Sequence, residues 1–234
     1  MFDVIAFDAD DTLWENEVFY TQAKRWLGGL LEEYVDVQVL VNALEETEMR
    51  NIHHFGYGIK SFTLSMVETA IRATQCRVKP DEILQIVEHS KDMLRREPQH
   101  FERVVETLEE LSQDYDLMLI TKGDLFEQEN KIARSALRRY FKFIEVVGSK
   151  TSETYRGIMH KYGIEPEGFL MVGNSLRSDI LPVLEAGGQA VYVPYENTWA
   201  HENAVDEGDT PGRYHTVEHL GELPELLKKL SAGQ

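Results

Sequence analysis

The chain has 234 residues and a formal net charge of −17 at neutral pH. Such an acidic chain argues against nucleic acid or an anionic membrane as the main partner, because both attract surfaces rich in Lys and Arg. The length is enough for one large domain or two smaller domains with a buried core.

The cysteine content and the hydropathy pattern bear on the compartment. Cys76 is the one cysteine, so no intramolecular disulfide can form, which suits a reducing environment. No apolar run is long enough to span a membrane. The N-terminus also lacks the basic region followed by an apolar stretch that marks a signal peptide. We therefore expect a cytoplasmic protein, either a monomer or a homodimer.

The first predicted element is the apolar run 2–7, which favours a short buried strand. It is followed at once by three carboxylates, Asp8, Asp10 and Asp11. Like charges at this spacing repel, and each tends to raise the pKa of the others. A purely structural segment has little reason to carry such a cluster, so the sequence predicts a functional site that includes a cation.

The next segment, residues 15–97, contains no convincing strand pattern. It carries four apolar stripes at helical spacing: Phe19, Ala23, Trp26, Leu27, Leu30 and Leu31; Val37, Leu40, Val41 and Leu44; Ile59, Phe62, Met66, Val67 and Ala70; and Ile83, Ile86, Val87 and Leu94. Four helices in succession predict a small bundle inserted after the first strand. We expect residues 15–97 to form this domain, and residues 1–14 and 98–234 to form a discontinuous core domain.

Four further apolar runs, 117–120, 143–147, 169–172 and 190–193, have the length and continuity of strands that are buried on both faces. Helical patterns lie between these runs. One begins at Pro98, a second can be capped by Asp124, and a third is capped by Thr151 or Ser152 and ends at Gly163. The alternation predicts an α/β fold with a parallel sheet and helices on both faces.

Polar clusters follow four of the predicted strands. They are residues 8–12, 121–124, 148–150 and 173–175, with Asp179 beyond the last. In an open parallel sheet, ligands bind beyond the carboxyl ends of the strands. We therefore expect these four clusters to meet at one edge of the sheet.

The oxygen-bearing side chains of these clusters suggest a metal. Asp8, Asp10, Asn174 and Asp179 offer hard oxygen ligands without Cys or His, which favours Mg²⁺ over zinc. Mg²⁺ beside Asp8 would keep that carboxylate ionised, and Lys150 would act in the same sense. An ionised carboxylate held in place is a competent nucleophile towards phosphorus. Asp10, with a raised pKa, could protonate the leaving oxygen and then deprotonate the attacking water.

The cluster after the second strand suits a phosphate group. Thr121 offers a hydroxyl, and the backbone N–H groups of Lys122 and Gly123 lie next to it, near an expected helix N-terminus. Gly123 also allows a close approach of the backbone. Lys150 and Mg²⁺ would balance the charge on the transferring group. A small phosphorylated substrate is therefore expected.

Together these motifs resemble those of the haloacid dehalogenase superfamily. The stretch Asp8-Ala9-Asp10-Asp11-Thr12 resembles its first motif, Asp-x-Asp-x-Thr. Thr121 is similar to the second motif, Lys150 to the third, and residues 173–179 (GNSLRSD) to the fourth. The resemblance covers the whole chain in order and spacing. The helical insertion after the first motif is similar to the cap of one subgroup.

The resemblance implies a Rossmann-like core and a Mg²⁺-dependent phosphatase that forms an aspartyl-phosphate on Asp8. It implies that Asp10 is the acid and base and binds the metal through its carbonyl. Thr121 and Lys150 would bind phosphate. Asp11 matches no catalytic position and is expected to hydrogen-bond the loop.

One position departs from the family pattern. The fourth motif usually has Asp where this chain has Asn174. An amide oxygen can still bind Mg²⁺, but the change removes one negative charge from the expected metal site. Asp179 could compensate in part, directly or through water.

Other functions remain open. A 2-haloacid dehalogenase would share the Asp8 nucleophile, but halide leaves without a proton, so Asp10 favours phosphate. A phosphomutase would share every core residue and differ in the cap. A phospho-ligand binding or regulatory protein without turnover is a further alternative, for which Asn174 is the one sign. A phospho-acceptor receiver domain fits less well, because its phosphorylated Asp follows a third strand in a much shorter chain.

Overall fold

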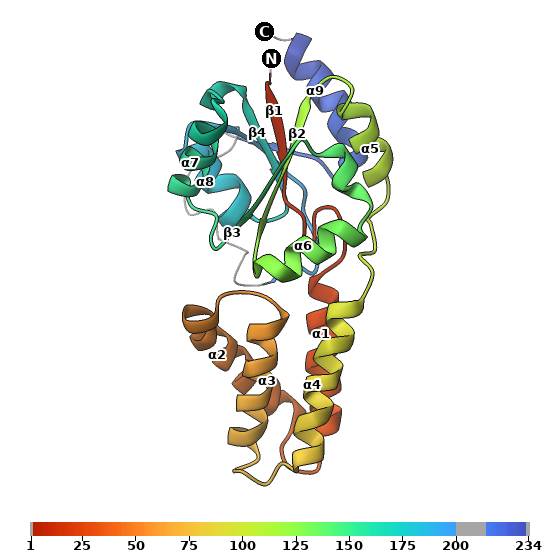
Figure 1. The fold of residues 1–234 in the computed structure, drawn as a ribbon, viewed down its shortest axis with the longest axis vertical. Helices are drawn as coiled ribbons and strands as arrows, with labels where there is room; N and C mark the ends of the chain where they lie inside the picture. The colour runs from red at the N-terminus through yellow and green to blue at the C-terminus, as the bar shows by residue number, and fades with distance from the viewer. Residues whose placement is uncertain (1, 200–213, 233–234) are drawn as a thin grey trace. The chain divides into compact units, whose positions relative to one another are not determined.

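The computed structural model describes residues 2–199 and 214–232, and Figure 1 shows its helices and strands. The strands are β1 (Val4–Phe7), β2 (Asp116–Lys122), β3 (Phe143–Val147), β4 (Phe169–Gly173), β5 (Gln189–Tyr192) and β6 (His215–Thr216). The helices are α1 (Glu17–Leu30), α2 (Val37–Phe55), α3 (Ile59–Ala73), α4 (Pro80–Arg95), α5 (Val104–Leu111), α6 (Leu125–Arg134), α7 (Ser152–Tyr162), α8 (Leu181–Glu185) and α9 (Leu223–Ala232). Short helical turns lie at Leu137–Tyr140, Pro166–Gly168, Leu176–Ile180 and Leu220–Glu222.

Within these described ranges the strands form one parallel sheet in the order β3-β2-β1-β4-β5-β6. The central strand is β1, whose last residue, Phe7, pairs with Leu119 of β2 and Val172 of β4. The segments that follow these three strands therefore leave the sheet side by side. The predicted parallel α/β sheet is confirmed.

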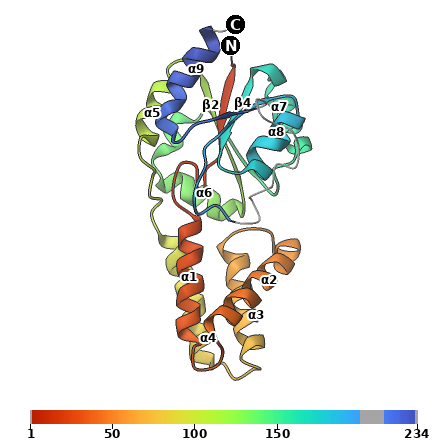
Figure 2. The same cartoon turned by 180° about the vertical axis from the view of Figure 1, so that it is seen from behind.

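The two faces of the sheet are covered by different helices. Ile5 and Phe7 pack with the apolar sides of α5 and α9, whereas Val4 and Ala6 pack with those of α7 and α8. Figures 1 and 2 show α5 and α9 on one side of the sheet and α7 and α8 on the other. Side chains alternate between the faces of a strand, so a continuous apolar run can serve both layers.

The chain divides into two compact units. The first, here called the sheet unit, comprises Met1–Glu17, Pro98–Lys122 and Gln128–Gln234 as far as these ranges are described. The second, here called the helical unit, comprises Val18–Glu97 and Gly123–Glu127. The predicted division at residues 14 and 97 stays a prediction, and it did not include residues 123–127 with the helices.

The helical unit is built on α1 to α4, and their apolar stripes form its core, which includes Leu27, Leu44, Met66 and Ile86. The helix α1 continues through both glycines of the first stripe. A Cβ atom at Gly28 would lie 2.7 Å from Val37 Cγ1, so this glycine admits a close contact with the start of α2.

The short segment Gly123–Glu127 is held in the helical unit by polar contacts at the start of α3. Glu127 Oε2 accepts a hydrogen bond of 2.8 Å from Ile59 N. Lys60 Nζ lies 2.8 Å from Asp124 Oδ2. Gly58 has a φ of +113°, and a Cβ atom there would lie 2.8 Å from Glu127 Oε2. A residue with a side chain at this position would therefore displace the Glu127 carboxylate.

The helix predicted from Pro98 begins later, at Val104. His100 forms an antiparallel bridge with Trp14, which keeps the chain extended next to the first loop. Arg103, with a φ of +67°, then turns the backbone into α5. The predicted helix is therefore present, but residues 98–103 belong to the connection before it.

The predicted helix ends are confirmed elsewhere. Asp124 Oδ1 accepts from Glu127 N at 3.0 Å, and Thr151 Oγ1 accepts from Thr154 N at 3.2 Å. Gly163 ends α7 with a φ of +65°. The sequence prediction missed β6, which is only two residues long and therefore has no periodic pattern.

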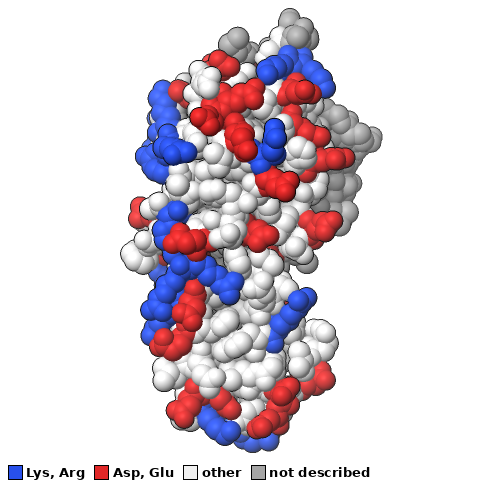
Figure 3. Space-filling view, turned by 90° about the vertical axis from the view of Figure 1, so that its right-hand side faces the viewer, with Lys and Arg blue, Asp and Glu red and all other residues white. Residues whose placement is uncertain are grey.

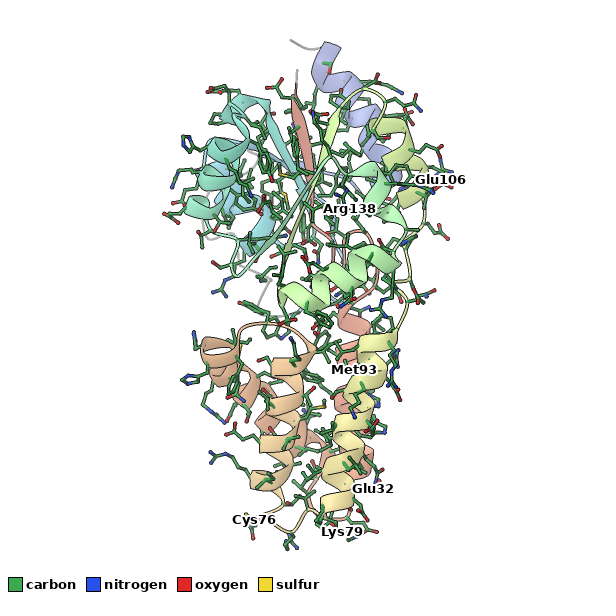
Figure 4. The ribbon with its side chains drawn as sticks, viewed as in Figure 1. Glu32, Cys76, Lys79, Met93, Glu106 and Arg138 are labelled. Atoms are coloured by element: carbon green, nitrogen blue, oxygen red, sulfur yellow. The ribbon has the colours of Figure 1, made fainter. Side chains whose placement is uncertain are left out.

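On the face shown in Figure 3, Asp and Glu side chains alternate with Lys and Arg side chains. Cys76 is exposed in the turn between α3 and α4, where Figure 4 labels it. None of the helices in residues 2–199 and 214–232 is both long and apolar enough to cross a membrane.

Candidate active site

The predicted site residues begin where the central strands end. Asp8 directly follows β1, and its backbone N donates to Val172 O at 2.9 Å. Thr121 and Lys122 are the last two residues of β2, and Asn174 directly follows β4. Parallel pairing thus aligns the first, second and fourth clusters at the carboxyl edge of the sheet, as the sequence predicted.

Lys150 joins two of the predicted acids in a buried group. Its Nζ lies 2.5 Å from Asp8 Oδ1 and 2.6 Å from Asp179 Oδ1. The other oxygen of Asp179 accepts from Ser175 N at 3.0 Å. A Cβ atom at Gly173 would lie 2.3 Å from Asp179 Oδ2, so only glycine leaves room for this carboxylate.

The electrostatics of this group are unbalanced, because two carboxylates share one ammonium group. Burial raises the pKa of Asp8 to about 7, although Lys150 opposes the rise, and the charge of Asp179 adds to it. Burial alone would lower the pKa of Lys150, but the carboxylates of Asp179 and Asp8 outweigh it and raise that pKa. The group therefore carries excess negative charge, and a further cation next to Asp8 would be favourable.

Thr12 connects Asp8 to Asn174. Its hydroxyl lies 3.0 Å from Asp8 Oδ2 and 3.1 Å from Asn174 Oδ1, and it accepts from Asn174 N at 3.1 Å. On the far side of the amide, Asn174 Nδ2 donates to Thr198 Oγ1 at 3.2 Å. The amide oxygen of Asn174 therefore faces the same Thr12 hydroxyl that contacts Asp8, while its nitrogen faces Thr198.

The environment of Asp10 differs from the one that the sequence led us to expect. Lys131 Nζ lies 2.6 Å from Asp10 Oδ1, Trp14 Nε1 donates to the same oxygen at 2.6 Å, and Gln128 Nε2 donates to Asp10 Oδ2 at 2.9 Å. Burial alone would raise the pKa of Asp10, but Lys131 and these hydrogen bonds outweigh it and lower that pKa. The predicted raised pKa of Asp10 is therefore wrong.

Asp11 has the structural role that was expected of it. Its backbone has a φ of +63°, and its carboxylate accepts from Asn16 N at 2.9 Å and from Glu17 N at 3.1 Å. These contacts close the loop before α1. Burial and the neighbouring charge of Asp10 raise the pKa of Asp11 to about 7.

The residues predicted to bind phosphate differ in their hydrogen-bond partners and in the unit to which they belong. Thr121 is buried, and its hydroxyl has no hydrogen-bond partner among the described residues. A buried hydroxyl without a partner is uncommon in proteins, and a phosphate oxygen bound at this strand end would give it one. Lys122 Nζ donates to Ser178 Oγ at 3.2 Å. Gly123 has a φ of +148° and belongs to the helical unit.

The donor set at the strand ends fits a hard cation such as Mg²⁺. In the described ranges, no three or more His, Cys, Asp or Glu side chains are grouped as a metal site. Two oxygens of different kinds are available here, a carboxylate oxygen of Asp8 and the amide oxygen of Asn174. They lie near each other, because both are within hydrogen-bonding distance of the Thr12 hydroxyl. A carboxylate and an amide oxygen beside excess negative charge suit Mg²⁺, which commonly keeps several waters.

Sequence reasoning missed Gln128, Lys131 and Thr198. The sequence shows only that Gln128 and Lys131 lie three residues apart on one face of a helix; the structure adds that both are buried while Leu125 and Phe126 are exposed. Buried polar side chains need polar partners, and here the partner is the Asp10 carboxylate. Thr198 lies in an irregular segment, and no pattern points to it.

Comparisons with known proteins place the chain in a family. A family model for haloacid dehalogenase-like hydrolases matches residues 2–187. The chain is similar to a haloacid dehalogenase-like family hydrolase from Xanthomonas campestris, with 38% identity and a TM-score of 0.88 over 99% of this chain and 93% of that chain.

Two curated phosphatases match part of the chain. N-acylneuraminate-9-phosphatase of Homo sapiens is 31% identical over 135 residues, which are 55% of this chain and 52% of that protein. Glyceraldehyde 3-phosphate phosphatase of Methanothermobacter thermautotrophicus is 28% identical over 54% of this chain and 58% of that protein. The chain thus matches only about half the length of these relatives. The family match itself spans most of the chain, and the chain belongs to the haloacid dehalogenase-like hydrolase family.

Proposed function

We propose that the chain is a Mg²⁺-dependent phosphatase that hydrolyses a small phosphorylated metabolite through an aspartyl-phosphate on Asp8. The observation that carries this proposal is the fixed position of Asp8. Its carboxylate is buried, in contact with Lys150 and Thr12, and an acid that can transfer protons, Asp10, follows two residues later. We propose that the helical segment 15–97 serves as the cap over substrates.

In the first step, an oxygen of Asp8 attacks phosphorus, and the bond from phosphorus to the ester oxygen breaks. Asp10 donates a proton to that leaving oxygen, having taken the proton up with the substrate. Lys150 and the hydroxyl of Thr121 hold the phosphoryl oxygens. Bound Mg²⁺ would supply positive charge that offsets the charge on these oxygens, and we propose Asp8, Asn174 and the Asp10 carbonyl as its protein ligands.

In the second step, Asp10 accepts a proton from water, which attacks phosphorus and releases phosphate from Asp8. The lowered pKa of Asp10 supports this role, because it favours the basic form of the carboxylate. We propose that Asp179 orients Lys150 rather than binding Mg²⁺ directly, since both of its oxygens already have partners.

The relatives guide the choice of substrate. The names of the two curated phosphatases describe small metabolites that carry phosphate, an acylneuraminate and a triose. We propose a substrate of this class, with phosphate esterified to an alcohol. The single cysteine supports a cytoplasmic setting, because a chain without a disulfide suits a reducing compartment.

A panel of phosphorylated sugars, polyols and acids, with p-nitrophenyl phosphate, tests the proposal in single-turnover hydrolysis. We expect phosphate release that requires Mg²⁺ and is lost in Asp8→Asn. Hydrolysis that continues without Mg²⁺ or in Asp8→Asn would contradict the mechanism. Tight binding of a phosphate analogue without any hydrolysis would instead favour a binding protein.

A dehalogenase is the second candidate, because it would use the same Asp8 nucleophile; one chain of similar fold is a 2-haloacid dehalogenase of Pseudomonas syringae pv. Tomato, at 23% identity and a TM-score of 0.66. That likeness concerns the fold alone. Asp10 argues for phosphate, since halide leaves without a proton. Chloride release from 2-chloropropionate is the measurement that separates the two candidates.

A further inference from the structure

We propose that Lys131 is a positioning residue for catalysis, which fixes the carboxylate of Asp10 against the leaving group together with Gln128 and Trp14. These three side chains are here called the Asp10 clamp. The inference rests on the proposed phosphatase function and deepens it, because it assigns a task to a buried cation that the proposed mechanism leaves unused.

The clamp engages both oxygens of the Asp10 carboxylate. Lys131 Nζ lies 2.6 Å from Oδ1 and 2.7 Å from Oδ2, so the ammonium group straddles the carboxylate. Trp14 adds a donor to Oδ1 and Gln128 adds a donor to Oδ2, at 2.6 and 2.9 Å. A carboxylate with donors on both oxygens has little freedom to turn about its side-chain torsions.

The clamp is itself held in place. Lys131 and Gln128 are buried, as is Trp14, and Lys131 Nζ also donates to Asn16 Oδ1 at 3.0 Å. The Lys131 ammonium group therefore has fixed partners on two sides. Long lysine side chains lose considerable entropy when they are ordered, so such a placement has to be stabilised by these contacts.

Gln128 connects the Asp10 carboxylate to the strand that precedes α6. Its Nε2 donates to Asp10, while its Oε1 is buried and has no hydrogen-bond partner in the described part of the chain. A buried oxygen without a partner costs free energy. The same Nε2 also donates to Lys122 O at 3.4 Å, so Gln128 links the Asp10 carboxylate to the end of β2.

The clamp joins distant parts of the chain. Asp10 and Trp14 belong to the loop after β1, while Gln128 and Lys131 lie on α6 after β2. Without α6, the Asp10 carboxylate would keep the donor of Trp14 on one oxygen but lose Gln128 and Lys131. Displacing a proton-transferring group by about 1 Å can lower a rate by about a hundredfold, so fixing this carboxylate matters for catalysis.

Leaving groups of different quality test the clamp. An alkyl phosphate needs a proton on its departing oxygen, whereas p-nitrophenolate departs readily without one. In Lys131→Met, we expect kcat for an alkyl phosphate to fall by about a hundredfold, because proton transfer contributes about a hundredfold or more. For p-nitrophenyl phosphate, kcat should fall by no more than about threefold, and KM for both esters should change by less than about twofold.

Two further variants and one control complete the experiment. Gln128→Met removes one donor without a change in charge and should show the same selective loss, about tenfold. Lys131→Arg should recover part of the alkyl phosphate activity. Lys228→Met, which removes an exposed lysine paired with Glu110, should change neither rate. Thermal unfolding of each variant checks that it is folded, and Gln128→Met serves if Lys131→Met is not.

The outcomes separate the two proposals. Equal losses for both esters, or no loss for either, overturn the clamp and leave the phosphatase function standing. Wild-type protein that hydrolyses no phosphate ester overturns the proposed function and the clamp with it. A selective loss for the alkyl ester in Lys131→Met and Gln128→Met supports the clamp.

Discussion

The sheet unit buries ion pairs where its strands end, whereas most described ion pairs of the helical unit are exposed, with Lys24 and Glu48 as an exception. In the sheet unit, Lys150 and Lys131 are buried next to carboxylates at the strand ends. In the helical unit, pairs such as Lys91 with Glu88 lie exposed along one helix. Exposed pairs of this kind contribute little to stability, whereas removal of one partner from a buried pair is costly. The buried pairs of the sheet unit lie at Asp8 and Asp10, the two residues proposed for catalysis.

The largest expected effect comes from removal of the nucleophile. Asp8→Asn should lower phosphate release by at least about a thousandfold. The melting temperature without Mg²⁺ should stay the same or rise, because the change relieves the crowding of Asp8 and Asp179 around one lysine. Single-turnover hydrolysis and thermal unfolding measure the two effects.

The control for this variant is Asp116→Asn, which removes the same charge from an exposed pair with Lys142. It should leave both activity and melting temperature nearly unchanged. A clear fall in the melting temperature of Asp8→Asn would show that Asp8 stabilises the fold, contrary to this expectation.

The next effect concerns the cations. Lys150→Met leaves Asp8 and Asp179 buried without their shared partner and should lower the free energy of unfolding by about 3–5 kcal/mol. Lys91→Met, in an exposed pair of the helical unit, should change it by no more than about 0.5 kcal/mol. Urea unfolding monitored by fluorescence compares the two variants. Similar losses in both would remove the distinction between the units.

A smaller effect is expected at the departure from the family pattern. Asn174→Asp adds a carboxylate beside Asp8 and should tighten Mg²⁺ binding by about tenfold, because ligand charge tunes the affinity of such sites. Without Mg²⁺ the variant should be less stable than wild type. Calorimetric titration with Mg²⁺ measures the affinity. Asn42→Asp adds the same charge to the exposed surface of α2 and should have no such effect.

The smallest effect tests acid sensitivity in the helical unit. His89 stacks on Trp26 with ring centroids 4.0 Å apart, and burial together with the charge of Arg96 lowers its pKa below the usual 6.5. The folded state therefore disfavours protonated His89, so its contribution to stability is present above pH 6.5 and is lost as the pH falls through the lowered pKa.

Melting temperatures at pH 7.5 and 5.5 measure this effect, in wild type and in His89→Gln, with the pH values chosen to bracket about 6.5. Wild type should lose slightly more stability on acidification than the variant does. A larger loss in the variant would show that protonation of His89 stabilises the folded state.

The sequence was sufficient for those features that depend on neighbouring residues. The strands before Asp8 and Asn174 are continuous apolar runs, and the helix caps at Asp124 and Thr151 depend on residues only three positions away. The position of Lys150 also followed from strand order. These features need no knowledge of contacts between distant segments.

The features that the sequence did not reveal depend on tertiary contacts. The pKa of Asp10 is lowered by Lys131, which lies in a different element, so the crowding of acids within the first loop was a poor guide. The late start of α5 follows from the bridge between Trp14 and His100. The Thr198 partner of Asn174 lies in an irregular segment.

The segment Gly123–Glu127 has a consequence for recombination between members of the family. Its carboxylates at Asp124 and Glu127 serve the first turn of α3, although the sequence places them just after a strand of the sheet unit. A chimera that exchanges residues 18–97 alone would separate α3 from these partners. Helical units should therefore be inherited, and transplanted, together with the five residues that follow Lys122.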